Sequence, residues 1–220
     1  MSSQPVRTRT IGGAAQLLLR ETGDLVELIA GNLVLLSSAA LATELEFGRL
    51  AATIRANSSK PPKRIVIGGL GFGATLRGVL DVAAPDANVI IVEKVEAVVE
   101  LVRGDLAYIA QRPLEDARVE LVRADVGHVL AQRAGDVDVI LLDVDNGPHW
   151  ASFRSNARLY TRQGLVALKR ALAPGGALSV WSGYRADPFL AQLRQVGFRP
   201  SAIPLAEKGR IRARAYVGQT

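Results

Sequence analysis

The feature that most constrains the fold of this chain is a run of β-branched residues that passes directly into a glycine-rich turn. Arg64–Ile67 has the character of a strand, and the sequence GGLGFG follows it at Gly68–Gly73. Glycine lets the backbone approach a ligand without a Cβ clash, and a helix beginning near Ala74 would point its N-terminal amides at the same place. The spacing Gly-x-Gly-x-Gly is a variant of the dinucleotide fingerprint. Taken alone, the turn also fits a tight strand-to-helix connection without a ligand.

From Arg64 onward the pattern alternates between strand and helix, which is typical of a parallel α/β sheet. Two final strand-like runs are joined only by Glu207–Gly209, so short a connection that they must form an antiparallel hairpin. The expected strands are residues 64–67, 88–92, 119–122, 137–142, 177–181, 198–205 and 210–217, and the expected helices are residues 74–84, 95–110, 126–133, 163–172 and 188–196.

The first quarter of the chain has a different pattern and predicts a small appendage. Short apolar runs at residues 15–20 and 25–30 flank a hairpin-like turn, and helical periodicity follows at residues 40–52. A polar, proline-bearing linker comes next. We therefore divide the chain into an N-terminal β-hairpin/helix appendage, residues 1–56, and a Rossmann-like domain, residues 57–220.

Composition limits the class of protein further. The absence of cysteine excludes thiolate metal sites and a catalytic thiol. The net charge of +6 is compatible with an anionic substrate or nucleic acid, but the arginines are scattered and aromatic residues make up only 5% of the chain. We therefore favour a basic soluble surface and do not expect a nucleic-acid partner. Leu33–Leu45 is too short and too polar for a membrane span, so we expect a cytoplasmic protein.

Acidic residues follow the expected strands at their carboxyl ends, the edge where open α/β sheets bind ligands. Glu93 ends a strand, and a carboxylate there can accept both hydroxyls of a ribose; the alternative is a solvated acid at a helix start. Asp125 can cap the next helix, accept an adenine amino group, or do both. We expect Lys94, beside Glu93, to be solvated. The turn and these acids together predict a nucleoside site.

Asp143 and Asp145 follow the strand predicted at residues 137–142, and Asn146, His149 and Trp150 come shortly after. A carboxylate at this edge can accept a proton from an attacking amine or hydroxyl, so both aspartates are catalytic candidates. We assign Asn146, His149 and Trp150 to an acceptor pocket. The alternatives are structural turn acids, a solvated His149, or a hard-cation site. We expect no metal, because no further acidic cluster is evident.

With these residues assembled, the chain resembles the spermidine synthase family within the class I methyltransferase superfamily. The resemblance rests on Arg64–Gly73, Val92–Glu93, Val119–Asp125, Asp138–Asp143 and Asn156–Gly176. It implies a Rossmann-like class I methyltransferase fold, in which a parallel sheet ends in a C-terminal antiparallel hairpin. It also implies a sulfonium donor, either S-adenosylmethionine or its decarboxylated form.

The resemblance further implies roles for individual residues. Glu93 would bind the ribose hydroxyls, and Asp125, with Val126 beside it, would bind the adenine. Asp143 matches an acid that helps to deprotonate the attacking amine, and we also assign it to the donor site. The residues of the turn that would hold the tail of the donor are Gly69, Leu70, Gly71 and Gly73.

The chain also departs from the synthases. Gly71 stands where they usually carry an aspartate that holds the aminopropyl amine, and the loop Asp143–Pro148 is shorter than theirs. We therefore favour methyl transfer from S-adenosylmethionine to a small-molecule amine or hydroxyl, with aminopropyl transfer as the alternative. Two other hypotheses are a non-catalytic nucleoside-binding protein and a nucleic-acid methyltransferase. The apolar Leu33–Leu45 could lie in a dimer interface, and we expect a homodimer.

Overall fold

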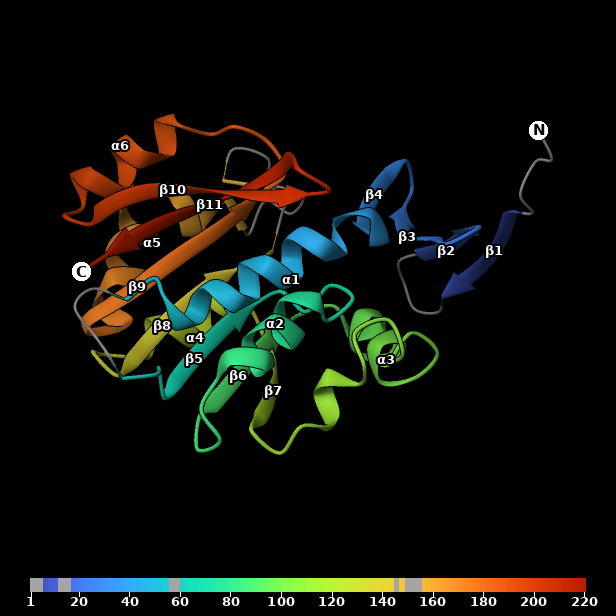
Figure 1. Ribbon diagram of the computed structural model, residues 1–220, viewed down its shortest axis with the longest axis horizontal. Coiled ribbons are helices and arrows are strands. Elements are labelled where there is room, and N and C mark those ends of the chain that lie inside the picture. Colours follow the sequence, from blue (N-terminus) through green and yellow to red (C-terminus); the bar gives the residue numbers. More distant parts are fainter. Residues whose placement is uncertain (1–5, 12–16, 56–59, 145–146, 149–155) are drawn as a thin grey trace.

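The computed structural model describes residues 6–11, 17–55, 60–144, 147–148 and 156–220, and these form two sheets (Figure 1). The larger sheet has seven strands in the order β10-β11-β9-β8-β5-β6-β7. Strands β5 to β9 are parallel, whereas β11 runs antiparallel to both β9 and β10. The predicted Rossmann-like fold with its C-terminal hairpin is therefore confirmed. The strands are β5 (Arg64–Gly68), β6 (Asn88–Glu93), β7 (Val119–Arg123), β8 (Val137–Leu142), β9 (Leu172–Ser182), β10 (Arg199–Glu207) and β11 (Arg210–Gln219).

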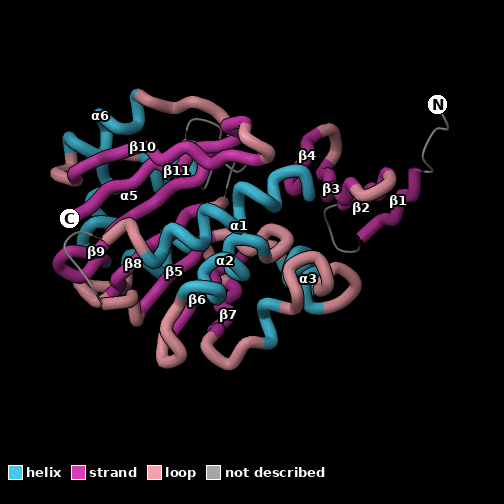
Figure 2. The backbone as a smooth tube through the Cα atoms, in the orientation of Figure 1, coloured by secondary structure: helices cyan, strands magenta, loops and turns pink. Residues whose placement is uncertain are grey.

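Helices cover both faces of the large sheet, which gives three layers (Figure 2). Side chains alternate along β5, so that Ile65 and Ile67 pack under one set of helices and Val66 under the other. This two-sided burial explains why the central strands read as continuous apolar runs. On the first face lie α1 (Leu41–Arg49), α2 (Ala74–Val82) and α3 (Glu96–Arg103); on the second lie α4 (Val126–Ala131), α5 (Arg162–Ala171) and α6 (Pro188–Gln195).

The N-terminal sheet extends to one side of the main body (Figure 1). Its strands β1 (Val6–Ile11), β2 (Leu17–Thr22), β3 (Leu25–Ala30) and β4 (Leu33–Ser37) are antiparallel and ordered β1-β2-β3-β4. Leu19 and Leu28 are buried in the same apolar cluster as the first face of the large sheet. The division of the chain between residues 56 and 57 stays a prediction.

Three elements differ from the sequence-based expectation. Strand β1 was not expected, because its alternating arginines and threonines are exposed and give no apolar strand pattern. Helix α3 ends at Arg103, well before residue 110, since Gly104 follows as its C-cap. Strand β9 begins at Leu172 rather than residue 177. None of these differences moves the carboxyl ends of the parallel strands.

Two glycines let α1 cross α2 at very close range. A Cβ at Gly48 would lie 2.1 Å from the carbonyl oxygen of Thr75, and a Cβ at Gly78 would lie 2.1 Å from that of Leu45. Real Cβ atoms do not come so close to a backbone oxygen, so both positions exclude a side chain. The crossing brings the N-terminal half of α1 to the start of α2, directly beside the glycine turn.

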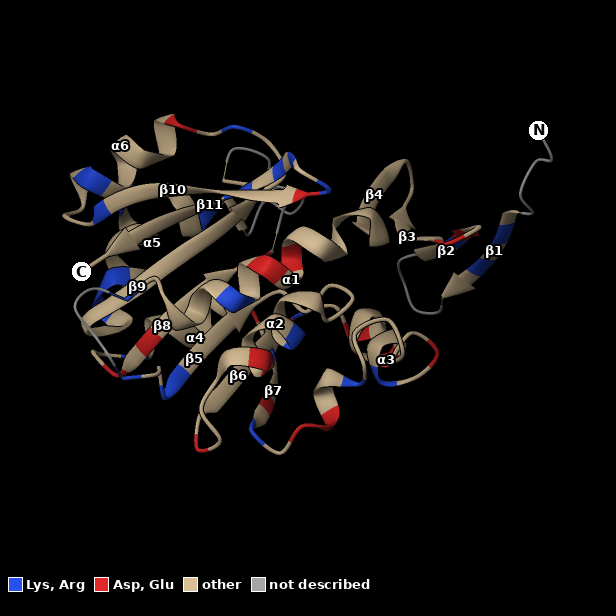
Figure 3. Cartoon of the chain, viewed as in Figure 1, with Lys and Arg blue, Asp and Glu red and all other residues tan. Residues whose placement is uncertain are grey.

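Charged residues of both signs are spread over many elements (Figure 3). Several arginines pair with acids, among them Arg118 with Asp116 at 2.8 Å and Arg64 with Asp136 at 2.9 Å. Within the described ranges, no helix is both long and apolar enough to cross a membrane.

Candidate active site

The glycine turn connects β5 to α2 in a conformation that only glycine adopts readily. Gly69, Gly71 and Gly73 have φ values of +90°, +52° and +90°. A Cβ at Gly69 would lie 2.1 Å from the carbonyl oxygen of Asp143, so glycine at this position lets the tips of β5 and β8 meet. At Gly71 the one described atom within 4 Å of a Cβ would be Leu36 Cδ2, at 4.0 Å. The turn is therefore tight against the sheet at Gly69 and open at Gly71.

Glu93, at the end of β6, holds this turn in place. Its Oε2 accepts a hydrogen bond from the Leu70 N–H at 2.9 Å, and its Oε1 accepts one from the Val95 N–H at 2.7 Å. A carboxylate oxygen can accept two hydrogen bonds. Counting only donors from the described residues, each oxygen of Glu93 therefore keeps one acceptor position for a ligand hydroxyl.

Asp125 lies between β7 and α4 and caps the helix. Its Oδ1 accepts hydrogen bonds from the N–H groups of Gly127 at 2.9 Å and His128 at 3.4 Å. Among the described residues, none donates a hydrogen bond to Oδ2. The capping role considered from the sequence is confirmed, and it leaves one carboxylate oxygen for another donor.

Asp143 follows β8, and its carboxyl group is buried. Its backbone N–H donates to the carbonyl of Gly68 at 2.8 Å, and its Oδ2 accepts a hydrogen bond of 2.6 Å from Thr75 Oγ1. Burial raises the pKa of Asp143 to about 6, although the bond from Thr75 opposes the rise. A carboxyl group with this pKa is a stronger proton acceptor than an ordinary aspartate.

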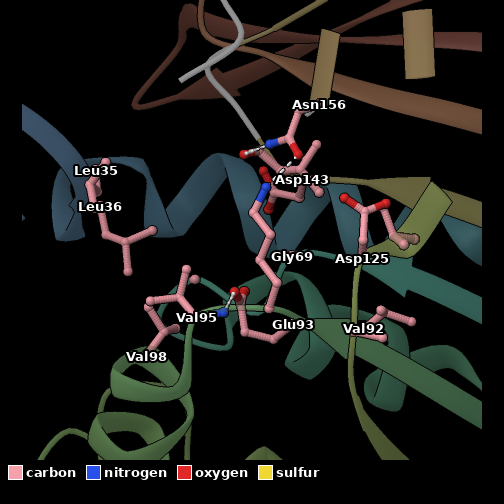
Figure 4. Close-up of a pocket in the computed structure, with 15 residues that line it drawn as sticks. Leu35, Leu36, Gly69, Val92, Glu93, Val95, Val98, Asp125, Asp143 and Asn156 are labelled. Atoms are coloured by element: carbon pink, nitrogen blue, oxygen red, sulfur yellow. Dashed lines mark hydrogen bonds between the residues drawn. The ribbon is translucent and has the colours of Figure 1, made fainter. Parts of the chain in front are cut away.

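The three carboxyl groups lie around one pocket (Figure 4). This pocket brings together six of the residues assigned to the donor: Gly69, Gly71, Glu93, Asp125, Val126 and Asp143. Two others do not line it. Leu70 is buried in the core and contributes its N–H to Glu93, while a Cβ at Gly73 would lie 2.9 Å from Pro113 Cγ. Asp145, Asn146, His149 and Trp150 lie outside the described residues, so their assignments stay predictions.

The sequence did not identify several residues that line the pocket. Leu35 and Leu36 reach it from β4. The apolar pattern of Leu33–Leu45 does not show which of its side chains would line a pocket. Lys94 is exposed, as expected from the sequence, and its Nζ also donates a hydrogen bond to Asn156 Oδ1 at 2.7 Å. The Asn156 amide also donates to the Val144 carbonyl at 3.3 Å. Lys94 therefore joins the tip of β6 to the segment that follows β8.

The groups that line this pocket fit a nucleoside. It offers acceptor positions on two separate carboxylates, apolar walls from β4 and α3, and a backbone bend that is open at Gly71. In the described part of the chain, no group of three or more His, Cys, Asp or Glu side chains could hold a metal ion.

Comparison with solved structures identifies the same fold in spermidine synthases. One is a spermidine synthase in complex with the transition state analogue AdoDATO, with a TM-score of 0.72 over 100% of this chain and 75% of that chain. Another is spermidine synthase from Thermotoga maritima, with a TM-score of 0.70 over 100% of this chain and 74% of that chain. Both are 19% identical in sequence, so the likeness concerns the fold.

A search of curated proteins found no match. The sequence model of the spermine/spermidine synthase domain, however, matches residues 49–190, which is more than half of the chain and includes the glycine turn and all three strand-tip acids. The chain therefore belongs to the spermine/spermidine synthase family, which confirms both the resemblance and the enzyme class expected from its sequence, a transferase dependent on a donor of the S-adenosylmethionine type.

Proposed function

We propose that this protein is an aminopropyltransferase that uses decarboxylated S-adenosylmethionine and a small-molecule amine. Family membership supports the aminopropyl reaction over the methyl transfer that we favoured from sequence. The observation that carries the proposal is the position of Asp143, a buried carboxyl group with a raised pKa in the same pocket as Glu93 and Asp125. A cytoplasmic location and a homodimer remain predictions.

Three groups would hold the donor. The free acceptor positions of Glu93 suit the two ribose hydroxyls, and Asp125 Oδ2 suits the adenine amino group. The open backbone at Gly71 would let the tail of the donor pass toward Asp143. When bound, the donor supplies a carbon made electrophilic by its sulfonium, with a neutral thioether as leaving group.

Asp143 would act on the acceptor. An amine must be neutral at nitrogen to attack carbon, and alkylamines are protonated near neutral pH. Thr75 fixes one oxygen of Asp143, so the other can accept the amine proton as the new N–C bond forms and the C–S bond breaks. Because the leaving thioether needs no proton, one base and good positioning suffice for the reaction.

The test is transfer by the purified protein, with decarboxylated and ordinary S-adenosylmethionine supplied separately together with a short diamine. Mass spectrometry of the products distinguishes an added aminopropyl group from an added methyl group. We expect aminopropyl product from the decarboxylated donor, and loss of about 10²–10⁴-fold in kcat in Asp143→Asn. No product from either donor, despite binding, would support a non-catalytic nucleoside-binding protein instead.

One observation favours methyl transfer as a second candidate. The turn has no carboxylate at Gly71 to pair with the ammonium of an aminopropyl group, and the space beside it is open. Ordinary S-adenosylmethionine carries a carboxylate at the same end of the molecule, which a carboxylate at position 71 would repel. Calorimetric preference for ordinary S-adenosylmethionine, with methylated product, would establish this candidate.

A further inference from the structure

A second acidic residue, from the N-terminal part of the chain, lies close to Asp143 through a shared contact with Thr75. Glu44 is on α1, and the Gly48–Gly78 crossing sets this helix against the start of α2. Thr75, at that start, contacts both residues: its Oγ1 lies 2.6 Å from Asp143 Oδ2 and 3.3 Å from the Glu44 carbonyl oxygen. Thr75 is itself 1% exposed. Thr75 therefore links the backbone of Glu44 to the carboxyl group of Asp143 through a buried side chain.

The carboxyl groups of Glu44 and Asp143 interact electrostatically, and both pKa values are raised. Burial raises the pKa of Glu44 well above its usual range, and the charge of Asp143 raises it further. Burial also raises the pKa of Asp143, but less, because Thr75 stabilises its charged form. Like charges in a buried site cannot both form easily, so such a pair gives up its protons one after the other.

The other charged groups near the pair come from elements that line the same pocket. The end of β6 contributes Glu93, with Lys94 directly after it, and the N-cap of α4 contributes Asp125. The nearby charges of α1 and α2 are engaged in ion pairs: Arg49 with Asp81 at 3.0 Å, and Arg77 with Asp81 at 2.9 Å. Of all these groups, Asp143 is the one whose charge raises the pKa of Glu44.

A buried donor also lies on this side of the sheet. Leu142 and Val180 are paired between β8 and β9, so the next residues, Asp143 and Trp181, follow at neighbouring strand tips. Trp181 packs in the core cluster that lies under α1, and it is 7% exposed. Its Nε1–H has no acceptor among the described residues. Trp181 therefore adds a buried N–H donor on the side of the sheet that α1 covers.

We propose that Glu44 is a positioning residue for Asp143, and that the two carboxyl groups act as one pair in which Glu44 keeps a proton while Asp143 carries the charge. The proposal rests on the proposed function for its catalytic meaning. During transfer, the amine nitrogen bonds to carbon, the C–S electrons pass to sulfur, and the amine proton moves to Asp143. Both acids are then neutral, and Asp143 returns its proton to solvent to restore the starting state.

The test compares Glu44→Gln with Glu46→Gln, a matched control on the exposed side of the same helix, where Glu46 pairs with Arg49 at 2.7 Å. Infrared difference spectroscopy of the free protein detects protonated carboxyl groups without any substrate. Near neutral pH we expect one protonated buried carboxyl group in the parent protein and in Glu46→Gln, and none in Glu44→Gln. Persistence of the signal in Glu44→Gln, or its absence from the parent, would overturn the proposal.

A second variant covers a failure of Glu44→Gln to fold. In Asp143→Asn the neighbouring charge is gone, so the proton of Glu44 should be lost at a lower pH than in the parent; an unchanged titration would refute the pairing. The pH profile of kcat/KM adds a functional readout. Glu44→Gln should keep kcat/KM within about tenfold near neutral pH, since Gln resembles protonated Glu, yet lack the second ionisation of the parent profile. If the spectra match these expectations but neither the parent protein nor any variant transfers an aminopropyl group, the carboxyl pair is supported and the proposed function is refuted.

Discussion

The charge of Asp143 should cost this protein stability, and replacing it should make the fold stronger as it removes activity. Asp143→Asn keeps an oxygen that can accept the hydrogen bond from Thr75, but it cannot ionise. In the folded protein the pKa of Asp143 is about 6, against an ordinary value of 3.8. At about 1.4 kcal/mol per pKa unit, this difference corresponds to about 3 kcal/mol of unfolding free energy.

The sign follows from proton linkage. Because the pKa is raised in the folded state, the folded protein binds more protons than the unfolded chain between the two pKa values, and stability falls as pH rises through this window. The penalty is absent below about pH 4 and complete above about pH 7. Asp143→Asn should therefore match the parent protein in acid and exceed it by up to about 3 kcal/mol at neutral pH.

Urea unfolding of both proteins at a series of pH values measures this difference directly. Asp86→Asn serves as a control of opposite sign, because Lys63 lowers the pKa of that exposed carboxyl group and its removal should weaken the fold at neutral pH. An Asp143→Asn protein that is less stable than the parent at neutral pH, with an unchanged difference in acid, would refute our account of a buried, strained charge.

Three further predictions concern the support of the site. Asp116→Asn should lower the unfolding free energy by at most about 2 kcal/mol at neutral pH, and the loss should vanish near pH 2, because Arg118 lowers the pKa of Asp116 to about 2; urea titrations at both pH values check this. Gly48→Ala should destabilise the protein by about 1–3 kcal/mol through overpacking against Thr75, measured by thermal unfolding, and a neutral result would mean that the helices can separate. Glu93→Gln should weaken donor binding by about 10–100-fold, as expected for lost charged hydrogen bonds; calorimetry that shows equal affinity would remove Glu93 from the site.

The grouping of the acids around the donor pocket could be predicted from the sequence for a physical reason. In a parallel sheet every strand ends at the same edge, so the residues that follow β5, β6, β7 and β8 must lie near one another. Glu93, Asp125 and Asp143 could therefore be grouped without knowledge of any contact. The open backbone at Gly71 followed from the conformational freedom of glycine.

Other parts of the site depend on tertiary contacts that local patterns do not encode. Glu44 lies in a stretch that looks like an apolar appendage, and only the crossing of α1 over α2 brings it to Asp143. Lys94 looks like an ordinary surface lysine, because its partner Asn156 is 62 residues away in the sequence. In both cases the two residues meet only in the folded protein, so their spacing in the sequence does not predict the contact.

The crossing of α1 and α2 also bears on which substitutions can change one part of the site without the other. The outer wall of the pocket, Leu35 and Leu36, and the acid Glu44 come from one continuous stretch, Leu33–Arg49, whereas Glu93 and Asp125 come from later strands. Part of the apolar wall of the pocket and the acid near Asp143 thus belong to a stretch of sequence separate from the carboxylates that would hold the nucleoside under the proposed function. Substitutions confined to Leu33–Arg49 would therefore change this wall and the surroundings of Asp143 while Glu93 and Asp125 stay as they are.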